Sequence, residues 1–254
     1  MMQKRQMEIL EHTQLTEEIF RLTLAGGIGA KPGQFVQVGL GPTWEPFLNR
    51  PFSVHNCTKT TLSLLYRVVG HGTRLLAQKQ RGSILSVVGP LGKGFPPTKR
   101  RQAVLVAGGI GAAPLYYLMR MLRAEGKDVI FLYGAKTAAQ IVLEDEYRSL
   151  AREFYLITED GTAGTKGLVT DLLPQILGEN EAEIFACGPN AMLRAVAQTA
   201  AEKKLPCFVS LEAQMACGVG ACLGCVVATA DGNYRRVCAD GPVFAAEEVF
   251  RFGS

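Results

Sequence analysis

The sequence predicts a β barrel followed by an α/β domain and a small cysteine-rich C-terminal domain, and three observations support this assignment. Between residues 1 and 98, short β-like runs are broken by turn residues at close intervals, which is typical of an antiparallel barrel or sandwich. From about residue 100 to 205, strand-like and helix-like segments alternate, as in a parallel sheet. The remaining residues are rich in glycine and cysteine. We therefore expect domains at 1–100, 101–206 and 207–254.

The composition is that of an ordinary globular protein and argues against several function classes. With 254 residues and 48% apolar content, the chain can bury a substantial core. The net charge of +4 is spread along the chain, and the densest basic stretch, Lys99–Arg101, is too short for a nucleic-acid footprint. No apolar run reaches the ~18 to 20 residues of a membrane span, and the opening residues lack a signal-peptide apolar stretch. We expect a cytoplasmic protein without a nucleic-acid or membrane partner.

The expected antiparallel barrel consists of five β-like runs and one helical patch. The patch covers residues 73–79, and Thr73 is placed to cap it after Gly72. The β-like runs lie at 19–25, 34–40, 52–57, 61–69 and 83–89.

Four strand–helix units follow in the central region. Consecutive units of this kind predict a parallel sheet with helices covering both of its faces. The strands are expected at 103–107, 128–135, 154–159 and 183–188, and the helices at 113–126, 143–151, 167–177 and 190–204.

The pentapeptide Gly-Gly-Ile-Gly-Ala occurs twice, at 26–30 and at 108–112. The first copy precedes a Pro-Gly turn between two barrel strands, so we interpret it as a structural loop. The second copy, with Gly108, Gly109 and Gly111, follows an apolar strand and opens a helix, a combination that forms an anion and dinucleotide site. It lacks the third glycine of the dinucleotide fingerprint and an acidic residue for a ribose, which leaves a structural turn as the alternative.

A second turn raises the odds of a nucleotide site in the α/β domain. Cys187, Gly188 and Pro189 follow the fourth strand and lead into a helix. Because the carboxyl ends of parallel strands meet at one edge of a sheet, this turn is expected near the second glycine-rich copy, where ligands bind in open α/β folds. The alternative is a loop that happens to contain glycine and proline.

Several residues of the barrel form a candidate flavin site. Arg50, Pro51, Phe52 and Ser53 combine a guanidinium suited to a pyrophosphate with a hydroxyl that could hydrogen-bond a flavin ring. Taken alone, this motif is better explained as a surface arginine before a strand. Further along the barrel come an aromatic face, a second cation and a helix N-terminus, contributed by Leu65, Tyr66, Arg67, Gly72 and Thr73.

The C-terminal cysteines give the strongest signal in the chain. Cys217, Cys222 and Cys225 are separated by four and two residues, and Cys238 follows after twelve more. Glycines between the first three allow a loop to surround one side of a cluster, with its backbone N–H groups free to bond the sulfurs. This pattern favours a [2Fe-2S] cluster, and structural zinc is the alternative because zinc also accepts four thiolates.

Taken together and in this order, the motifs cover nearly the whole chain. The combination resembles the ferredoxin reductase-like superfamily, and most closely the electron-transfer subunits of NAD-dependent, class B dihydroorotate dehydrogenase. The stretch EAQMACGVGACLGCVV, at 212–227, is similar to the cluster region of this family. Related flavin subunits of sulfide dehydrogenase and of ferredoxin:NADP reductase complexes usually have an aspartate where this chain has Cys217, which favours the dihydroorotate family.

The resemblance implies FAD, a [2Fe-2S] cluster and NAD as substrate. It implies FAD contacts from the barrel residues named above, four cluster ligands at Cys217, Cys222, Cys225 and Cys238, and no acid–base catalytic residue in this chain. It also implies an FMN-containing dihydroorotate dehydrogenase catalytic subunit as partner, in a heterotetramer of two plus two chains. The partner is expected to contact the C-terminal region.

Other readings stay open at this stage. The chain could serve a different flavoenzyme complex, or be a zinc-containing binding module without enzyme activity. The cofactor could be NADP, since Lys136 follows the second strand of the α/β region and could meet a 2′-phosphate. Finally, we hypothesise that Cys187 lies near the nicotinamide and tunes that pocket.

Overall fold

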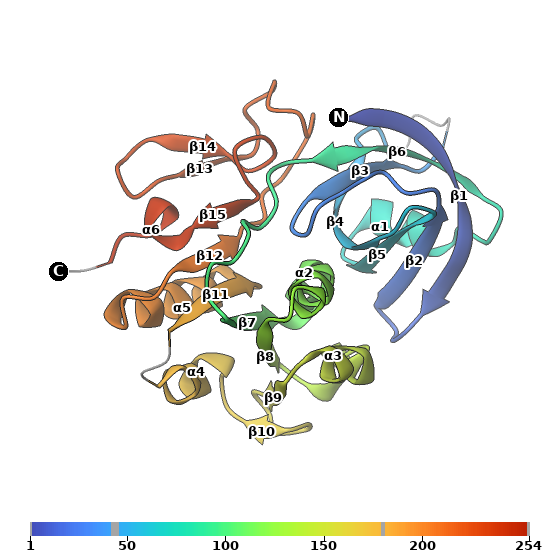
Figure 1. Cartoon of the computed structure of the whole chain (residues 1–254). Coiled ribbons are helices and arrows are strands. Elements are labelled where there is room, and N and C mark those ends of the chain that lie inside the picture. Colours follow the sequence, from blue (N-terminus) through green and yellow to red (C-terminus); the bar gives the residue numbers. More distant parts are fainter. Residues whose placement is uncertain (1, 42–45, 179–180, 253–254) are drawn as a thin grey trace.

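A computed structural model describes residues 2–41, 46–178 and 181–252 of the chain. The chain folds into an N-terminal barrel, a central α/β region and a C-terminal region, and the barrel lies to one side of the other two (Figure 1). This arrangement confirms the fold class expected from the sequence.

The barrel is closed and antiparallel, with the strand order β1-β2-β5-β4-β3-β6. Its side chains alternate, so that residues such as Leu22, Leu24 and Val36 fill the interior while their neighbours face outward. The strands are β1 (Gln3–Gln14), β2 (Ile19–Ala25), β3 (Phe35–Gly39), β4 (Arg50–Cys57), β5 (Thr61–Arg67) and β6 (Ile84–Leu91).

Strand β1 was not expected from the sequence. It is rich in charged and polar residues, and only Met7 and Ile9 of its twelve residues are buried. Its pairing with β2 on one side and β6 on the other closes the barrel. Because two partners supply the hydrogen bonds, a strand with little apolar content of its own is stable here.

The central sheet has seven strands in the order β10-β9-β8-β7-β11-β12-β15. All neighbouring pairs are parallel except β12 and β15. The strands are β7 (Gln102–Gly108), β8 (Asp128–Ala135), β9 (Glu153–Thr158), β10 (Thr165–Lys166), β11 (Ala182–Cys187), β12 (Cys207–Ser210) and β15 (Val243–Ala245). The chain order reverses between β7 and β11, which in folds of this kind creates a crevice at the carboxyl ends of those strands.

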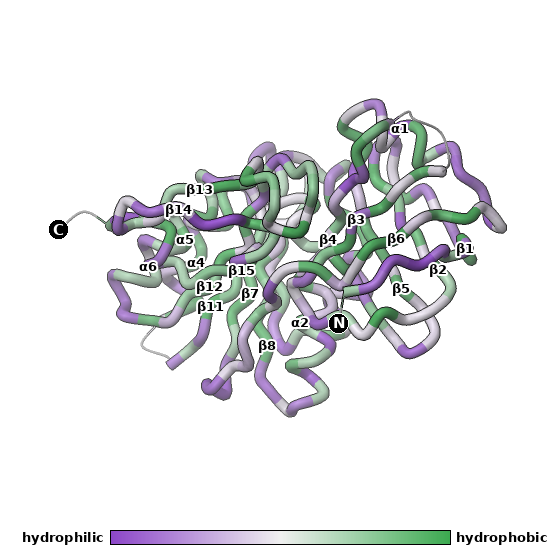
Figure 2. Tube along the Cα trace, turned by 90° about the horizontal axis from the view of Figure 1, so that it is seen from above, coloured by the Kyte–Doolittle hydropathy of each residue, from purple (hydrophilic) through white to green (hydrophobic). Residues whose placement is uncertain are grey.

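Helices cover both faces of this sheet, as expected, and hydrophobic residues run along its central strands while hydrophilic ones gather in the loops (Figure 2). The helices α2 (Ala112–Ala124) and α3 (Glu144–Leu150) pack in one core, and α4 (Val169–Leu177) and α5 (Asn190–Glu202) pack in the other. The short turn η1 (Gly109–Gly111) leads into α2. A short turn η2 (Ala138–Gln140) follows β8.

The barrel helix α1 (His71–Ala77) begins two residues earlier than expected. Thr73 therefore lies inside the first turn rather than at the cap. Its hydroxyl reaches back to accept hydrogen bonds from the N–H groups of Val69 and Gly70, at 2.9 and 3.1 Å. Thr73 thus caps the helix from within its first turn. For this reason the sequence pattern predicted that the helix begins at Thr73.

The C-terminal region contributes to the central sheet and also forms a unit of its own. Its strands β12 and β15 extend the sheet, while the hairpin of β13 (Val226–Ala228) and β14 (Tyr234–Arg236) stands apart, and α6 (Ala246–Val249) follows. The domain boundaries near 100 and 206 stay a prediction, since the sheet runs across the second of them.

Helix α2 joins the barrel to the sheet. The buried His55 of β4 bonds the carbonyl of Ala113 through Nδ1 at 3.0 Å, and the Tyr117 hydroxyl donates to the Ala30 carbonyl at 3.1 Å. Arg120 donates to the Asn56 side chain at 2.7 Å. The barrel is thereby held against the start of the helix that follows the second glycine-rich copy. Among the described residues, no helix is both long and apolar enough to span a bilayer.

Candidate functional site

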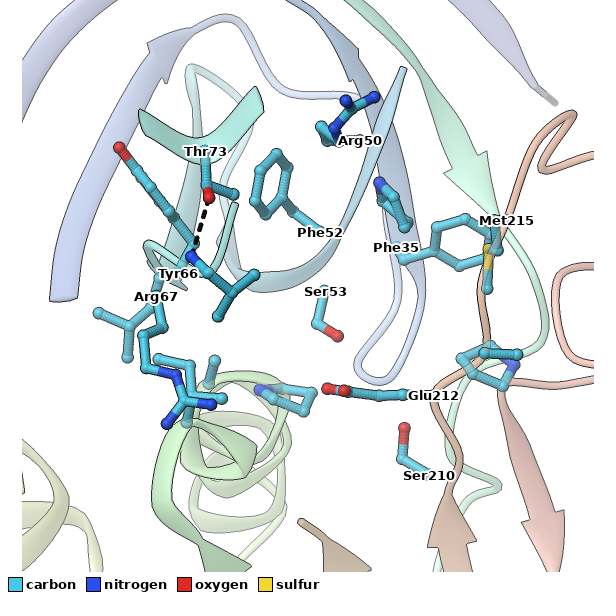
Figure 3. A pocket seen from close by; sticks show the side chains of 18 of the residues that line it. Phe35, Arg50, Phe52, Ser53, Tyr66, Arg67, Thr73, Ser210, Glu212 and Met215 are labelled. Atoms are coloured by element: carbon cyan, nitrogen blue, oxygen red, sulfur yellow. Dashed lines mark hydrogen bonds between the residues drawn. The ribbon is translucent and has the colours of Figure 1, made fainter. Parts of the chain in front are cut away.

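A cavity of about 330 Å³ lies where the three regions meet (Figure 3). Barrel strands form one wall, the start of α2 forms the floor, and the segment after β12 forms the opposite wall. The lining residues are Phe35, Arg50, Pro51, Phe52, Ser53, Leu65, Tyr66, Arg67, Val69, Thr73, Ile110, Ala113, Pro114, Ser210, Leu211, Glu212, Ala213, Met215 and Pro242.

The structure brings the predicted flavin residues together around this cavity. Every residue of Arg50–Ser53 and of Leu65–Arg67 lines it, and so does Thr73. Gly72 does not line it but supports Arg50, because a Cβ on Gly72 would lie 2.3 Å from the Arg50 Nε. The glycine thus lets the guanidinium pack directly against the first turn of α1.

Tyr66 is held rigidly at the cavity wall. Its ring stacks on Phe20 with centroids 5.6 Å apart, and it meets Phe52 at 5.4 Å. Its hydroxyl lies 2.9 Å from His12 Nε2, and His12 Nδ1 lies 2.8 Å from the carbonyl of Lys79. Since a carbonyl only accepts, Nδ1 carries the proton and Tyr66 donates to Nε2. Burial raises the pKa of Tyr66, so the hydroxyl stays protonated.

One wall of the cavity was not predicted. The segment from Ser210 to Met215 follows β12, and Ser53 and Glu212 point into the same part of the cavity from opposite sides (Figure 3). The stretch beginning at Glu212 was linked to the cluster through family resemblance, without a role at the flavin. Its position was readable in principle, because β12 lies beside β11 and ends at the same edge of the sheet.

The two predicted nucleotide turns lie against each other at the carboxyl edge of the sheet. A Cβ on Gly111 would lie 2.2 Å from the carbonyl oxygen of Cys187, and one on Gly108 would lie 2.6 Å from Pro189 Cδ. Gly188 is also confined, because a Cβ there would lie 2.7 Å from Met192 Cε and 2.9 Å from the Gly108 backbone. Because these glycines have no side chains, the turn at 108–111 and the turn at 187–189 pack directly against each other. Gly109 faces open space, with a positive φ of 53°.

These nucleotide residues do not line the cavity themselves. Of the second Gly-Gly-Ile-Gly-Ala copy only Ile110 reaches it, followed by Ala113 and Pro114 at the start of α2. Cys187 pairs with the cavity residue Ser210 across strands β11 and β12. Burial, and then the Glu212 carboxylate, raise the pKa of Cys187, so the thiol is neutral and unreactive. Cys187 is buried and does not line the cavity, while Lys136 lies exposed after β8.

The C-terminal cysteines are arranged as two pairs. A backbone N–H to sulfur contact joins Cys222 to Cys217, and another joins Cys238 to Cys225 at 3.4 Å. Backbone N–H groups point at the sulfurs: Gly220 donates to Cys238 Sγ at 3.1 Å, and Cys222 donates to Cys217 Sγ at 3.4 Å. The Val219 N–H, 3.4 Å from Cys217 Sγ, and then the Cys222 N–H lower the pKa of Cys217 to about 6, which favours the thiolate that metals require.

The donor set fits a [2Fe-2S] cluster. Such a cluster takes four thiolates, two on each iron, and structural zinc also accepts four thiolates. The backbone N–H groups aimed at the sulfurs of Cys217, Cys225 and Cys238 would stabilise the negative charge of a bound cluster.

An ion pair fixes the loop that carries the cysteines. Arg236 meets Asp240 through two parallel contacts, Nε to Oδ2 and Nη2 to Oδ1, each 3.0 Å long. The Nη1 of the same guanidinium donates to the carbonyl of Gly220 at 3.2 Å. A bidentate pair has defined geometry, so Arg236 joins the loop at Gly220 to the segment that contains Cys238.

The comparisons with known proteins agree with this geometry. Residues 212–250 match the model for the iron-sulfur cluster binding domain of dihydroorotate dehydrogenase B, and residues 105–198 match the model for the oxidoreductase NAD-binding domain. Two curated relatives, from Bacillus cereus (strain Q1) and Bacillus mycoides (strain KBAB4), are each 40% identical over 261 residues, covering 98% of this chain and 99% of theirs. Both are dihydroorotate dehydrogenase B (NAD(+)) electron transfer subunits.

A solved structure shares the fold over almost the full length. It comes from a study of flavin-based electron bifurcation by the NADH-dependent reduced ferredoxin-NADP oxidoreductase. The TM-score is 0.86 at 31% sequence identity, and the similarity covers 96% of this chain and 89% of that one.

The fold and the site define a class of protein, the NAD-dependent iron–sulfur oxidoreductases with a ferredoxin reductase-like fold. Within that class, the chain belongs to the family of dihydroorotate dehydrogenase B electron transfer subunits. The family, the enzyme class and the expected cofactor set of FAD, [2Fe-2S] and NAD are thereby confirmed. The relatives are subunits, so a catalytic partner chain is implied.

Proposed function

We propose that this chain passes electrons from a dihydroorotate dehydrogenase catalytic subunit through a [2Fe-2S] cluster and FAD to NAD+, in pyrimidine biosynthesis. One observation carries the proposal. The wall segment Ser210–Met215 of the flavin cavity continues, after a single residue, into the ligand Cys217. One short segment therefore connects the wall of the flavin cavity to the cluster loop.

Each group of residues has a task in this proposal. When bound, FAD and the cluster together convert single electrons into the hydride that NAD+ accepts. Arg50 and the first turn of α1 hold the FAD pyrophosphate, while Tyr66 and Ser53 orient the flavin ring in the cavity. The interlocked turns at Gly108–Gly111 and Cys187–Pro189 bind the nicotinamide cofactor at the sheet edge. Cys187 shapes that pocket by packing, since its buried thiol is neutral.

The C-terminal region offers a surface for the partner chain. Four apolar side chains around the cysteine loop are solvent-exposed, Val219, Leu223, Val226 and Tyr234. A one-electron carrier must lie between two flavins, so this surface is where we place the FMN-containing catalytic subunit. We further propose a heterotetramer of two plus two chains that works in the cytoplasm.

Reconstitution tests the proposal. The chain, loaded with FAD and cluster, should restore dihydroorotate-dependent NAD+ reduction when mixed with the catalytic subunit. Tyr234→Ser, at a side chain 69% exposed on the C-terminal surface, should weaken complex formation while leaving the cluster spectrum intact. Leu168→Ser, at a side chain 51% exposed on the distant α4 end, is the matched control and should bind normally. Equal binding by both variants would contradict the partner surface.

A second function has support from the solved structure at 31% identity, which belongs to a ferredoxin-NADP oxidoreductase. In that case the chain would serve a different flavoenzyme complex. Affinity purification from the native cell separates the two functions, because the dihydroorotate assignment requires the catalytic subunit to co-purify. Recovery of another flavoprotein in its place would favour the second function.

A further inference from the structure

Gln37, in the middle of β3, is a buried amide without a partner. Its side chain is 2% exposed, and neither Nε2 nor Oε1 has a hydrogen-bond partner among the described residues. Leaving such a group unpaired costs about 1–3 kcal/mol, and buried polar groups in native proteins are nearly always bonded. We therefore expect the Gln37 amide to have a hydrogen-bond partner in the protein when its cofactors are bound.

The side chain lies directly on the cysteine loop. A Cβ built on Gly218, the residue after Cys217, would be 2.7 Å from Gln37 Nε2 and 2.8 Å from its Cγ. Gly218 also has a positive φ of 69°. The absence of a side chain there allows the amide of a barrel residue to reach the backbone of the loop that surrounds the predicted cluster.

Strand β3 connects this contact to the flavin cavity. Val36 and Val38 point into the barrel core, so Phe35 and Gln37 share the outer face of the strand. Phe35 lines the cavity and packs in the same apolar cluster as Cys225 and Cys238. Two residues further along that face, Gln37 reaches the loop at Gly218.

We propose that Gln37 donates a hydrogen bond from its side-chain amide to a sulfur of the [2Fe-2S] cluster, either Cys217 Sγ or a bridging sulfide, and so raises the reduction potential of the cluster. Thiolate and sulfide sulfurs only accept hydrogen bonds, so the NH2 end of the amide faces them. A reduced cluster carries one more negative charge than an oxidised one, and a donated hydrogen bond stabilises it more. Gln37 is a positioning and tuning residue, and this inference rests on the ligand set proposed above.

Redox titration of the cluster in the full complex, followed by electron paramagnetic resonance, tests the inference. In Gln37→Leu, the equilibrium constant for cluster reduction should fall about tenfold, which corresponds to about 59 mV for a one-electron couple. Gln102→Leu is the matched control, because the Gln102 side chain also has a buried, unpartnered Oε1 but lies on β7, away from the loop. Its potential should equal that of the wild type.

A second measurement does not depend on the folding of a variant. Wild-type protein with 15N in the glutamine side-chain amides should show a nitrogen coupling in pulsed spectra of the reduced cluster. No such coupling, or an unchanged potential in Gln37→Leu with full cluster content, would overturn the role of Gln37. A wild-type complex without any iron–sulfur signal would instead contradict the proposed function.

Discussion

The two copies of Gly-Gly-Ile-Gly-Ala share more than their letters, yet they lie in different chemical settings. In each copy one glycine permits close backbone approach, Gly27 to the carbonyl of Thr58 and Gly111 to that of Cys187. In each copy another glycine has a positive φ in open space, Gly29 and Gly109. Each copy therefore contains one close-approach glycine and one open glycine, but at exchanged positions, so the same letter has opposite backbone roles in the two segments. What each segment approaches also differs.

The strand before each copy decides that difference. The first copy follows the antiparallel strand β2, and its glycines pack the chain against a neighbouring turn of the barrel. The second follows the parallel strand β7 and leads into α2, so it lies at the sheet edge beside the turn of a second parallel strand. A pentapeptide gains a binding role only where the topology supplies a helix N-terminus and a crevice.

The largest predicted contrast between the copies follows from the two close-approach glycines. Alanine at either position would place Cβ within 2.2 Å of a backbone carbonyl oxygen, so each variant should lose about 1–3 kcal/mol of unfolding free energy. Gly111→Ala should also slow NADH-dependent flavin reduction about a hundredfold, because it separates the two nucleotide turns. Gly27→Ala should leave that rate unchanged. Stopped-flow measurements on the folded variants give the flavin-reduction rate of each. Equal rates for Gly111→Ala and Gly27→Ala would contradict the predicted contrast.

The isoleucines of the two copies predict a second contrast. Ile28 is buried in the barrel core, so Ile28→Ala should lower the unfolding free energy by about 2–5 kcal/mol. Ile110 lines the flavin cavity, so Ile110→Ala should instead weaken FAD binding about tenfold, through lost apolar contact. Denaturant titration and the FAD content after gel filtration separate the two effects. FAD loss from the Ile28 variant alone would reverse the assignment.

A pH effect should appear where the second copy meets the barrel. Burial lowers the pKa of His55, which bonds the Ala113 carbonyl, to about 4 from its ordinary value of 6.5. Between these two pH values, His55 is protonated in the unfolded chain but neutral in the folded protein. The contribution of His55 to the unfolding free energy is therefore fully present above pH 6.5 and is lost as the pH falls to 4. The loss should total about 3 kcal/mol.

Denaturant titrations from pH 7.5 to 4.5 check this pH effect. The variant His55→Gln carries no titrating group and should show a flatter profile than the wild type over this range. Parallel profiles for the two proteins would assign the acid sensitivity to other groups.

The smallest predicted effect comes from the two open glycines. Gly29→Ala and Gly109→Ala meet no atoms but force alanine into a left-handed conformation, so each should cost about 1 kcal/mol of unfolding free energy. Thermal unfolding of the two variants should therefore agree. A much larger loss in Gly109→Ala would mean that the nucleotide turn is packed more tightly than its open surroundings indicate.

Much of the fold could be predicted because its signals are local. Strand β8 begins and ends where the apolar run 128–135 does, and the second Gly-Gly-Ile-Gly-Ala copy opens a helix as its position after a strand indicates. Strand β1 escaped detection, since its stability comes from two partner strands rather than from apolar residues. The start of α1 was misplaced because Thr73 caps the helix from within its first turn.

The parts of the candidate site that consist of one continuous motif could be predicted from the sequence. The parts that form where distant segments pack together could not. The cysteine spacing and Arg50–Ser53 were found from sequence alone, and the structure gathers the latter around the cavity. Glu212 and Gln37 were missed as site residues. A glutamine on the outer face of a strand suggests contact with water, and only the packing of the C-terminal loop at Gly218 reveals that it is buried.

The central claim is that one path joins the nicotinamide site, the flavin cavity and the cysteine loop. An anaerobic visible spectrum of the purified chain, recorded while NADH is titrated in, tests it most directly. Both the flavin and the iron–sulfur bands should bleach. A colourless preparation containing stoichiometric zinc, or bleaching of the flavin with no change in the iron–sulfur bands, would contradict it.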